Sequence, residues 1–160
     1  MAIISRTLTP ERALQRLAAI CAKREICQYD ARQRLYRWGL EPDEHDGIIQ
    51  QLVEKGFIDD QRFAEMFVKE KSSLNHWGPH KLQQELRRRG IHPQQVQHLF
   101  DDNDKDDMRN TLCGLLQRKL QTLHDTDAYQ CKQKLIRYAI SKGYAYDDII
   151  QCLPREANTD

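Results

Sequence analysis

Three glycines divide this chain at a regular interval. Each follows an amphipathic segment: Gly39 ends "RLYRWG", Gly90 ends "ELRRRG" and Gly143 ends "AISKG". The interval is about 50 residues both times, a period typical of stacked helical repeats. Glycine readily adopts the left-handed conformation that ends a helix. The spacing therefore predicts a tandem array of helical repeats, and the alternative is an irregular helical bundle in which such stops recur by chance.

An apolar pair follows each glycine after a short acidic or proline-containing turn. Residues four apart lie on one face of a helix, so each pair predicts a short helix that closes a three-helix repeat. The pairs are Ile48 with Leu52, Val96 with Phe100, and Ile149 with Leu153. We expect an elongated all-α protein with three-helix repeats over residues 9–58, 59–104 and 105–155.

Capping residues support the helical prediction. Thr9 precedes Pro10 at the start of the first helix, and Asp30 and Asp60 are the predicted N-caps of the second and fourth helices. Runs of alternating β-branched residues, which would indicate strands, are absent from the sequence. The acidic segment 101–107 is expected to be a linker and helix start. It resembles half of a calcium-binding loop, but Leu112 occupies the position of the bidentate glutamate.

Composition restricts the class of protein. Only 39% of the residues are hydrophobic and 31% are charged, which suits stacked helices with much exposed surface better than a compact globule. The sequence has no apolar run of about 18 residues that could span a membrane, and its start lacks the apolar core of a secretory signal. We therefore expect a cytoplasmic protein without a membrane partner.

The five cysteines form no CxxC pair. An odd number without a secretory signal predicts reduced thiols. Cys113 and Cys152 lie among leucines and isoleucines, where cysteine behaves as a small hydrophobic residue.

Catalytic and metal-binding motifs are missing from the sequence. There is no nucleophile elbow, no HExxH zinc motif and no phosphate-binding loop. His76 and His80 are four apart, but Pro79 lies between them and no carboxylate stands at ligand spacing. We expect no enzymatic activity, no cofactor and no metal.

Two consecutive stretches carry a resemblance to a known family. "LVEKGFIDDQRFAEMFVKEK" followed by "WGPHKLQQELRRRGI" resembles the central signature of the RecX family, which regulates the bacterial recombinase RecA. The resemblance extends loosely over residues 10–153 and implies tandem three-helix units. It also implies binding along the groove of the RecA filament, restraint of strand exchange and co-protease activity, and contact with DNA. The first repeat departs from the family pattern in "KREICQYDARQRLYRWG".

Several signature residues build the fold rather than a binding site. One caps a helix, two pack in the core, two form a tight turn into the next helix and one ends it. These residues are Asp60, Phe63, Leu86, Gly78, Pro79 and Gly90.

Basic residues in the second repeat are the candidates for partner binding. Residues 60–100 contain seven lysines and arginines against four acids, although the net charge of the whole chain is only +1. Lys81, Gln84 and Arg88 form one polar stripe opposite the leucines at helical spacing, and the stem of Arg89 is expected to follow the edge of the core. The candidates are Lys69, Lys71, Lys81, Gln84, Arg87, Arg88 and Arg89, with Trp77, Arg34, Arg37, Lys132, Lys134 and Arg137 as weaker ones.

Other functions remain open at this point. The helix "QQELRRRG" could read bases in the major groove, as in a free-standing helix-turn-helix DNA-binding protein, or the chain could be a helical adaptor. Trp77 could stack on a base or plug a helix junction, and the second role is favoured. We expect a monomer whose partner is the RecA filament, with contact to single- or double-stranded DNA.

Overall fold

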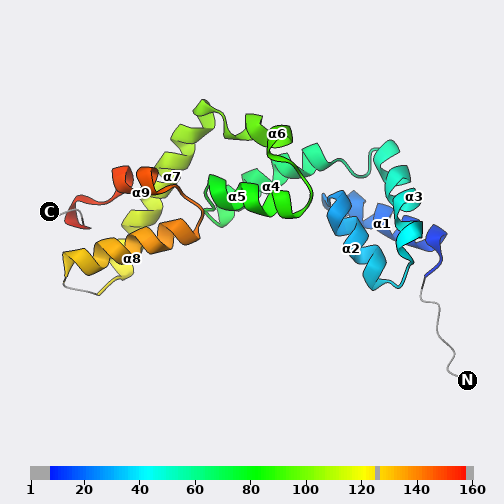
Figure 1. Cartoon of the computed structure of the whole chain (residues 1–160), viewed down its shortest axis with the longest axis horizontal. Helices are drawn as coiled ribbons and strands as arrows, with labels where there is room; N and C mark the ends of the chain where they lie inside the picture. Colours follow the sequence, from blue (N-terminus) through cyan, green and yellow to red (C-terminus); the bar gives the residue numbers. More distant parts are fainter. Residues whose placement is uncertain (1–7, 125–126, 158–160) are drawn as a thin grey trace, which may run out of the picture. The chain divides into compact units, whose positions relative to one another are not determined.

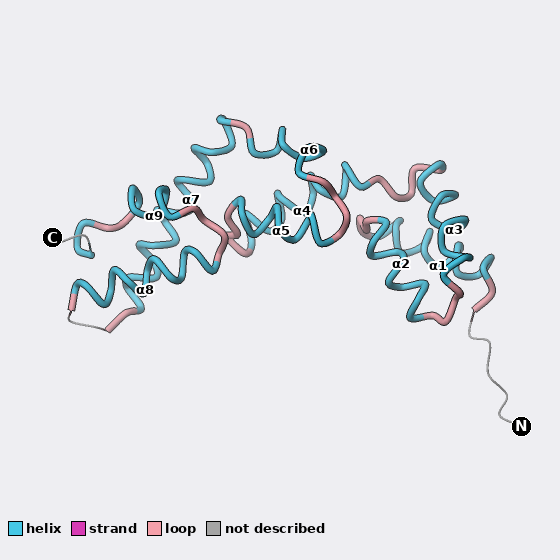
Figure 2. Tube along the Cα trace, viewed as in Figure 1, coloured by secondary structure: helices cyan, strands magenta, loops and turns pink. Residues whose placement is uncertain are grey.

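The computed structural model describes residues 8–124 and 127–157, without the side chains of residues 102–104. Every regular element in these ranges is a helix, which confirms the all-helical prediction (Figure 2). None of the helices in this part of the chain is long and apolar enough to cross a membrane. The first seven residues, on which part of the expectation about a secretory signal rests, lie outside the described residues.

The described helices occur in the predicted tandem order of three-helix repeats, which is confirmed (Figure 1). The helices belong to two compact units. The first unit ends at Met66 and also contains residues 89–91, and the second unit begins at Phe67, so the division falls inside the second repeat. The helices are α1 (Pro10–Lys23), α2 (Gln28–Arg37), α3 (Pro42–Glu54), α4 (Asp60–Leu74), α5 (Pro79–Arg88), α6 (Pro93–Val96), α7 (Asp102–Thr122), α8 (Ala128–Ser141) and α9 (Tyr146–Cys152).

The three glycines end helices as predicted. Gly39, Gly90 and Gly143 have φ angles of 81°, 76° and 99°, in the left-handed region that L side chains rarely adopt. Each lies two residues after the last residue of the second helix of its repeat, so the glycine period is the repeat period.

The first repeat packs α1 and α2 against α3. Its core contains Leu17, Leu35 and Leu52, each no more than 1% exposed, one from each helix. Thr9 caps α1 as predicted, because its hydroxyl accepts the N–H of Arg12 at 3.3 Å. The sequence did not indicate that a histidine, His45, is buried here; its Nε2 lies 3.0 Å from the carbonyl oxygen of Leu40.

The predicted cap at Asp30 is wrong. α2 begins at Gln28, so Asp30 lies in its first turn and not before it. The N–H of Gln28 instead donates to a carboxylate oxygen of Asp60, 32 residues further along the chain, at 2.9 Å. A distant residue therefore supplies the cap that the local sequence was expected to supply.

The third repeat packs α7, α8 and α9 together (Figure 1), and one apolar core lies between them. Leu112, Leu116, Leu135 and Ile149 are fully buried in it. α7 begins at Asp102, so the acidic segment 101–107 is a helix start, as predicted, and only Asp101 precedes the helix. Acidic side chains interact favourably with a helix N-terminus, which is consistent with this early start.

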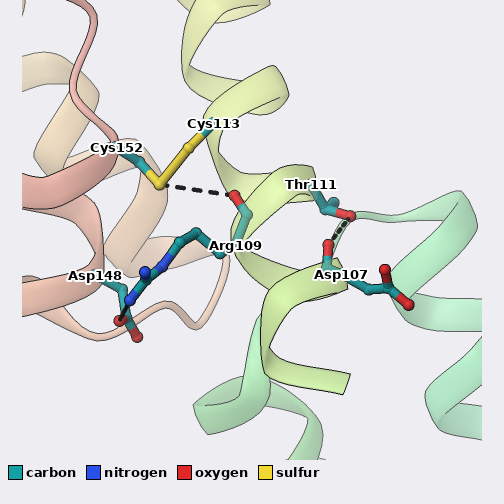
Figure 3. Close-up of a disulfide and its surroundings, with 6 residues drawn as sticks. All are labelled: Asp107, Arg109, Thr111, Cys113, Asp148 and Cys152. Carbon is teal, nitrogen blue, oxygen red and sulfur yellow. Dashed lines mark hydrogen bonds and ion pairs between the residues drawn. A yellow bond between two sulfur atoms is a disulfide. The ribbon is translucent and has the colours of Figure 1, made fainter. Parts of the chain in front are cut away.

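The prediction of reduced thiols is wrong for one pair. Cys113 of α7 and Cys152 of α9 form a disulfide (Figure 3). Both cysteines lie on the faces where the two helices pack together, and their Cα atoms are 4.9 Å apart. Cys21, Cys27 and Cys131 are not part of this disulfide.

Candidate partner-binding surface

The helix that carries most of the seven principal candidate residues, α5, begins at a backbone junction with the α8–α9 loop. The N–H of Gly78 donates to the carbonyl oxygen of Lys142 at 2.6 Å, and the N–H of His80 donates to that of Gly143 at 2.9 Å. The first N–H groups of a helix have no partner within it, so the loop satisfies donors at the start of α5. The junction connects the second repeat to the third within one compact unit.

Two glycines allow the backbones to meet at this junction. A Cβ atom on Gly78 would lie 2.6 Å from the carbonyl oxygen of Gly143, and one on Gly143 would lie 2.6 Å from the backbone nitrogen of Lys81. The buried hydroxyl of Tyr144 donates to the carbonyl oxygen of His76 at 2.8 Å beside them. Gly78 was expected only to form a tight turn; the structure shows that it is also a contact between repeats.

The three consecutive arginines at the end of α5 differ in their surroundings. Arg88 is exposed and pairs with Glu85 at 3.1 Å. Arg89 has a side chain that is only 19% exposed, and its Nε lies 3.8 Å from Asp30, so its stem follows the core edge as predicted. Arg87 is exposed, and within the described chain no ion pair or hydrogen bond engages its side chain.

Lys81 does not have the exposed position expected of the polar stripe. Its side chain is half-buried, its Nζ lies 3.5 Å from the carbonyl oxygen of Ser141, and it lies 4.5 Å from the ring centroid of Trp77. The face of α5 opposite the leucines is covered at its start by the α8–α9 loop. Gln84, one turn further along, is exposed.

The ring of Trp77 contacts two lysine side chains. It is half-buried, packs edge-on against Phe67 with a centroid distance of 6.1 Å, and has the ammonium groups of Lys71 and Lys81 at 5.2 and 4.5 Å from its centroid. Such distances are those of cation–π interactions. Lys69 lies nearby in sequence on α4, is exposed, and makes no side-chain contact of this kind with the other described residues.

The weaker candidates lie on α2 and α8, the second helices of the other two repeats. Arg37 is exposed and its Nε donates to the carbonyl oxygen of Gln33 at 3.4 Å, while Arg34 is half-buried. The other weaker candidates lie on α8. They are Lys132, which is half-buried, and Lys134 and Arg137, which are exposed.

The predicted cap at Asp60 is also wrong. The carboxylate of Asp59 caps α4, because it accepts the N–H groups of Gln61 and Arg62 at 3.0 and 3.1 Å. Asp60 is the first residue of α4 and turns its carboxylate to Gln28. Burial, together with the nearby charge of Asp59, raises the pKa of Asp60, while the N–H of Gln28 opposes that shift.

A cavity that no sequence pattern predicted lies beside the start of α5. Its volume is about 510 Å³, and its walls come from α5, α7 and the start of α9. The apolar side chains of Met108, Leu112 and Tyr144 line it together with the charged side chains of Arg109 and Asp148, which pair at 3.8 Å. Among the described residues, no three His, Cys, Asp or Glu side chains gather as metal ligands.

Family profiles match both repeats that build this surface. Residues 59–98 match the RecX second three-helix domain, and residues 106–153 match the RecX third three-helix domain. Together these matches cover more than half of the chain.

Whole-chain comparisons give the same family. The chain is 34% identical over 128 residues to a protein named Regulatory protein RecX from Clostridium botulinum (strain Eklund 17B / Type B), covering 79% of this chain and 59% of the relative. A protein of the same name from Amycolatopsis mediterranei (strain U-32) is 26% identical over 141 residues, covering 86% of this chain and 81% of the relative. The chain thus spans about three fifths of the length of the clostridial relative.

Solved structures share the fold. The crystal structure of RecX from Lactobacillus salivarius has a TM-score of 0.68 at 19% identity, covering 89% of this chain and 93% of that one. Another structure, a crystal structure of regulatory protein RecX, has a TM-score of 0.70 at 18% identity, covering 89% and 70%.

Proposed function

The chain belongs to the RecX family, and from that premise we propose that it binds the RecA nucleoprotein filament and restrains its recombinase and co-protease activities. It acts in the cytoplasm as a monomer and by binding alone, without catalysing a reaction. The observation that carries the proposal is the end of α5 in the matched second repeat, where Arg87 and Arg88 are exposed.

The geometry of α5 suits recognition of an anionic surface. Backbone hydrogen bonds to the α8–α9 loop fix the start of the helix. A fixed helix loses little conformational freedom when its arginines engage a partner. Arginine also presents a planar fork that matches carboxylate and phosphate groups.

Arg87 and Arg88 are the principal contacts in this proposal. Arg87 engages no other described side chain, and the pair between Arg88 and Glu85 is an exposed one of the kind worth about 0–1 kcal/mol. Either guanidinium can therefore turn to an acidic groove or a DNA phosphate at little cost. Lys69, Lys71 and Gln84 extend the surface along α4 and α5.

Binding to three targets tests the function. Fluorescently labelled protein is titrated with RecA assembled on single-stranded DNA, with free RecA and with the bare DNA. We expect the filament to bind most tightly, and strand exchange and repressor cleavage to fall as the protein saturates it. Equal affinity for bare DNA, with the steep salt dependence of a phosphate binder, would instead favour a free-standing DNA-binding protein.

Charge-reversed variants test the site. The Arg87→Glu, Arg88→Glu protein should lose filament binding. An Arg12→Glu, Arg118→Glu protein changes the net charge by the same amount at two exposed arginines on α1 and α7 and should bind like the parent. Equal losses in both variants would show that net charge, and not the end of α5, determines binding.

A further inference from the structure

The two cysteines of the third repeat are placed for disulfide exchange. Cys113 and Cys152 are 39 residues apart in sequence, on α7 and α9, and are joined (Figure 3). Their Cα distance of 4.9 Å lies within the range of about 4.4–6.8 Å that disulfides require. The bond can therefore form or open without movement of the two helix backbones.

The structure also offers a hydrogen-bond acceptor for the thiol of Cys152 in the reduced state. The Sγ of Cys152 lies 3.6 Å from the carbonyl oxygen of Arg109, one turn before Cys113 on α7 (Figure 3). A thiol at that position donates its proton to the carbonyl oxygen, whereas the disulfide sulfur has no proton to donate. Reduction consequently leaves no buried donor without a partner.

The third repeat also has a core that does not depend on the bond. Leu112, Leu116 and Ile149 pack α7 and α9 together and are fully buried. The ion pair of Arg109 with Asp148 connects the same two helices at 3.8 Å. Opening the disulfide therefore leaves a folded protein from which the bond can form again.

From these observations we infer that Cys113 and Cys152 are a reversible modification site, oxidised by a small-molecule disulfide such as glutathione disulfide. Cys113 is half-buried and Cys152 is only 7% exposed, so Cys113 reacts first. Its thiolate attacks one glutathione sulfur, forms a mixed disulfide and releases one glutathione thiolate. The thiolate of Cys152 then attacks the Cys113 sulfur and releases the second glutathione. Two protein thiols are oxidised and one glutathione disulfide is reduced to two glutathione thiols.

The inference goes beyond filament binding and is tested on the chain alone. The native protein is equilibrated in buffers of increasing ratio of oxidised to reduced glutathione, quenched, denatured and labelled with a maleimide. Intact mass should change from five labels to three, with Cys21, Cys27 and Cys131 still labelled, and the change should reverse when reduced glutathione is added. The oxidised form should melt higher by on the order of 5–15 °C.

Two variants establish the order of reaction. Cys152→Ser should stop at one glutathione adduct on Cys113, whereas Cys113→Ser should react much more slowly, because the remaining sulfur is buried. Cys131→Ser, at a buried thiol on α8, is the matched control and should still form the pair. Because labelling follows denaturation, the number of labelled cysteines can be measured even where a variant is less stable.

Three outcomes would overturn the inference. The pair could stay reduced in excess glutathione disulfide, it could resist millimolar reduced glutathione in native buffer, or Cys131 could replace one partner. The second outcome would make the bond a permanent structural crosslink rather than a modification site.

Discussion

The carbonyl oxygen of Gly143 lies where a side chain on Gly78 would begin. A Cβ atom on Gly78 would be 2.6 Å from that oxygen and 2.8 Å from Cδ1 of Tyr144. Backbone atoms cannot move away as the end of a flexible side chain can, so only glycine fits at this point between the second and third repeats.

Gly78→Ala should therefore destabilise the protein. Overpacking typically costs about 1–3 kcal/mol, and the shift would also strain the 2.6 Å hydrogen bond from Gly78 to Lys142. Chemical denaturation measures the change. The control is Gly47→Ala in α3, where a Cβ meets nothing within 4 Å and alanine should add roughly 0.5–1 kcal/mol of stability. A neutral Gly78→Ala would contradict the close contact.

Asp59 and Asp60 are adjacent but should stabilise the starts of different helices, α4 and α2. Asp59→Ala removes the acceptor for the Gln61 and Arg62 amides and should cost about 0.5–2 kcal/mol. Asp60→Ala removes the acceptor for Gln28 on another helix. Amide hydrogen exchange separates them: the first variant should expose residues 61–62 and the second residue 28. Loss of protection at 61–62 in the Asp60 variant would contradict the assignment.

Stability should fall in alkaline solution because of Tyr144. Burial raises the pKa of its phenol to about 12, while the unfolded phenol titrates near its ordinary value of about 10. Between these values the unfolded state loses the proton first, so the contribution of Tyr144 is complete below about pH 10 and is lost towards pH 12 at about 1.4 kcal/mol per pH unit.

Urea unfolding between pH 9 and 12 measures this fall. Tyr144→Phe should lessen it, although the variant starts about 1 kcal/mol less stable because the hydrogen bond to His76 is lost. Tyr129→Phe, at an exposed tyrosine on α8, keeps Tyr144 and should show the parent slope. A parent slope in Tyr144→Phe would assign the alkaline loss to other groups.

Leu86 is fully buried on α5, one residue before the arginines. Leu86→Ala should lower the free energy of unfolding by about 2–5 kcal/mol, because it leaves a cavity in the core. Leu74→Ala removes the same atoms from a residue that is 72% exposed and should change stability by at most about 0.5 kcal/mol. Thermal melting compares the two, and equal effects would mean that Leu86 is not a core residue.

Local signals predicted the repeat architecture, and distant contacts account for what the sequence did not reveal. Helix stops at Gly39, Gly90 and Gly143 depend on backbone conformation that glycine alone favours, so they are visible in the sequence. The cap of α2 is not, because Asp60 supplies it from 32 residues away.

The candidate binding surface likewise combines features that local sequence predicts with features that depend on distant contacts. Helical periodicity correctly placed the stem of Arg89 at the core edge, since Leu86 lies one turn before it. It could not show that the α8–α9 loop covers Lys81, because that loop lies about 60 residues away. Likewise, the disulfide of Cys113 with Cys152 depends on how α7 packs against α9 and not on cysteine spacing.

Substitutions at the end of α5 should separate an effect on folding from an effect on binding. Arg87→Glu with Arg88→Glu should change stability by about 1 kcal/mol or less, because one side chain has no described partner and the other has an exposed pair with Glu85. The same double variant replaces two attractions with two repulsions at an anionic partner, so we expect filament affinity to fall by at least about tenfold. Arg89→Ala should instead lower stability more than filament affinity, because it removes a largely buried stem and the contact with Asp30. Melting and filament binding are measured on the same purified proteins. If the double variant melts and binds like the parent, these arginines only complete the helix and the partner must contact another part of the chain.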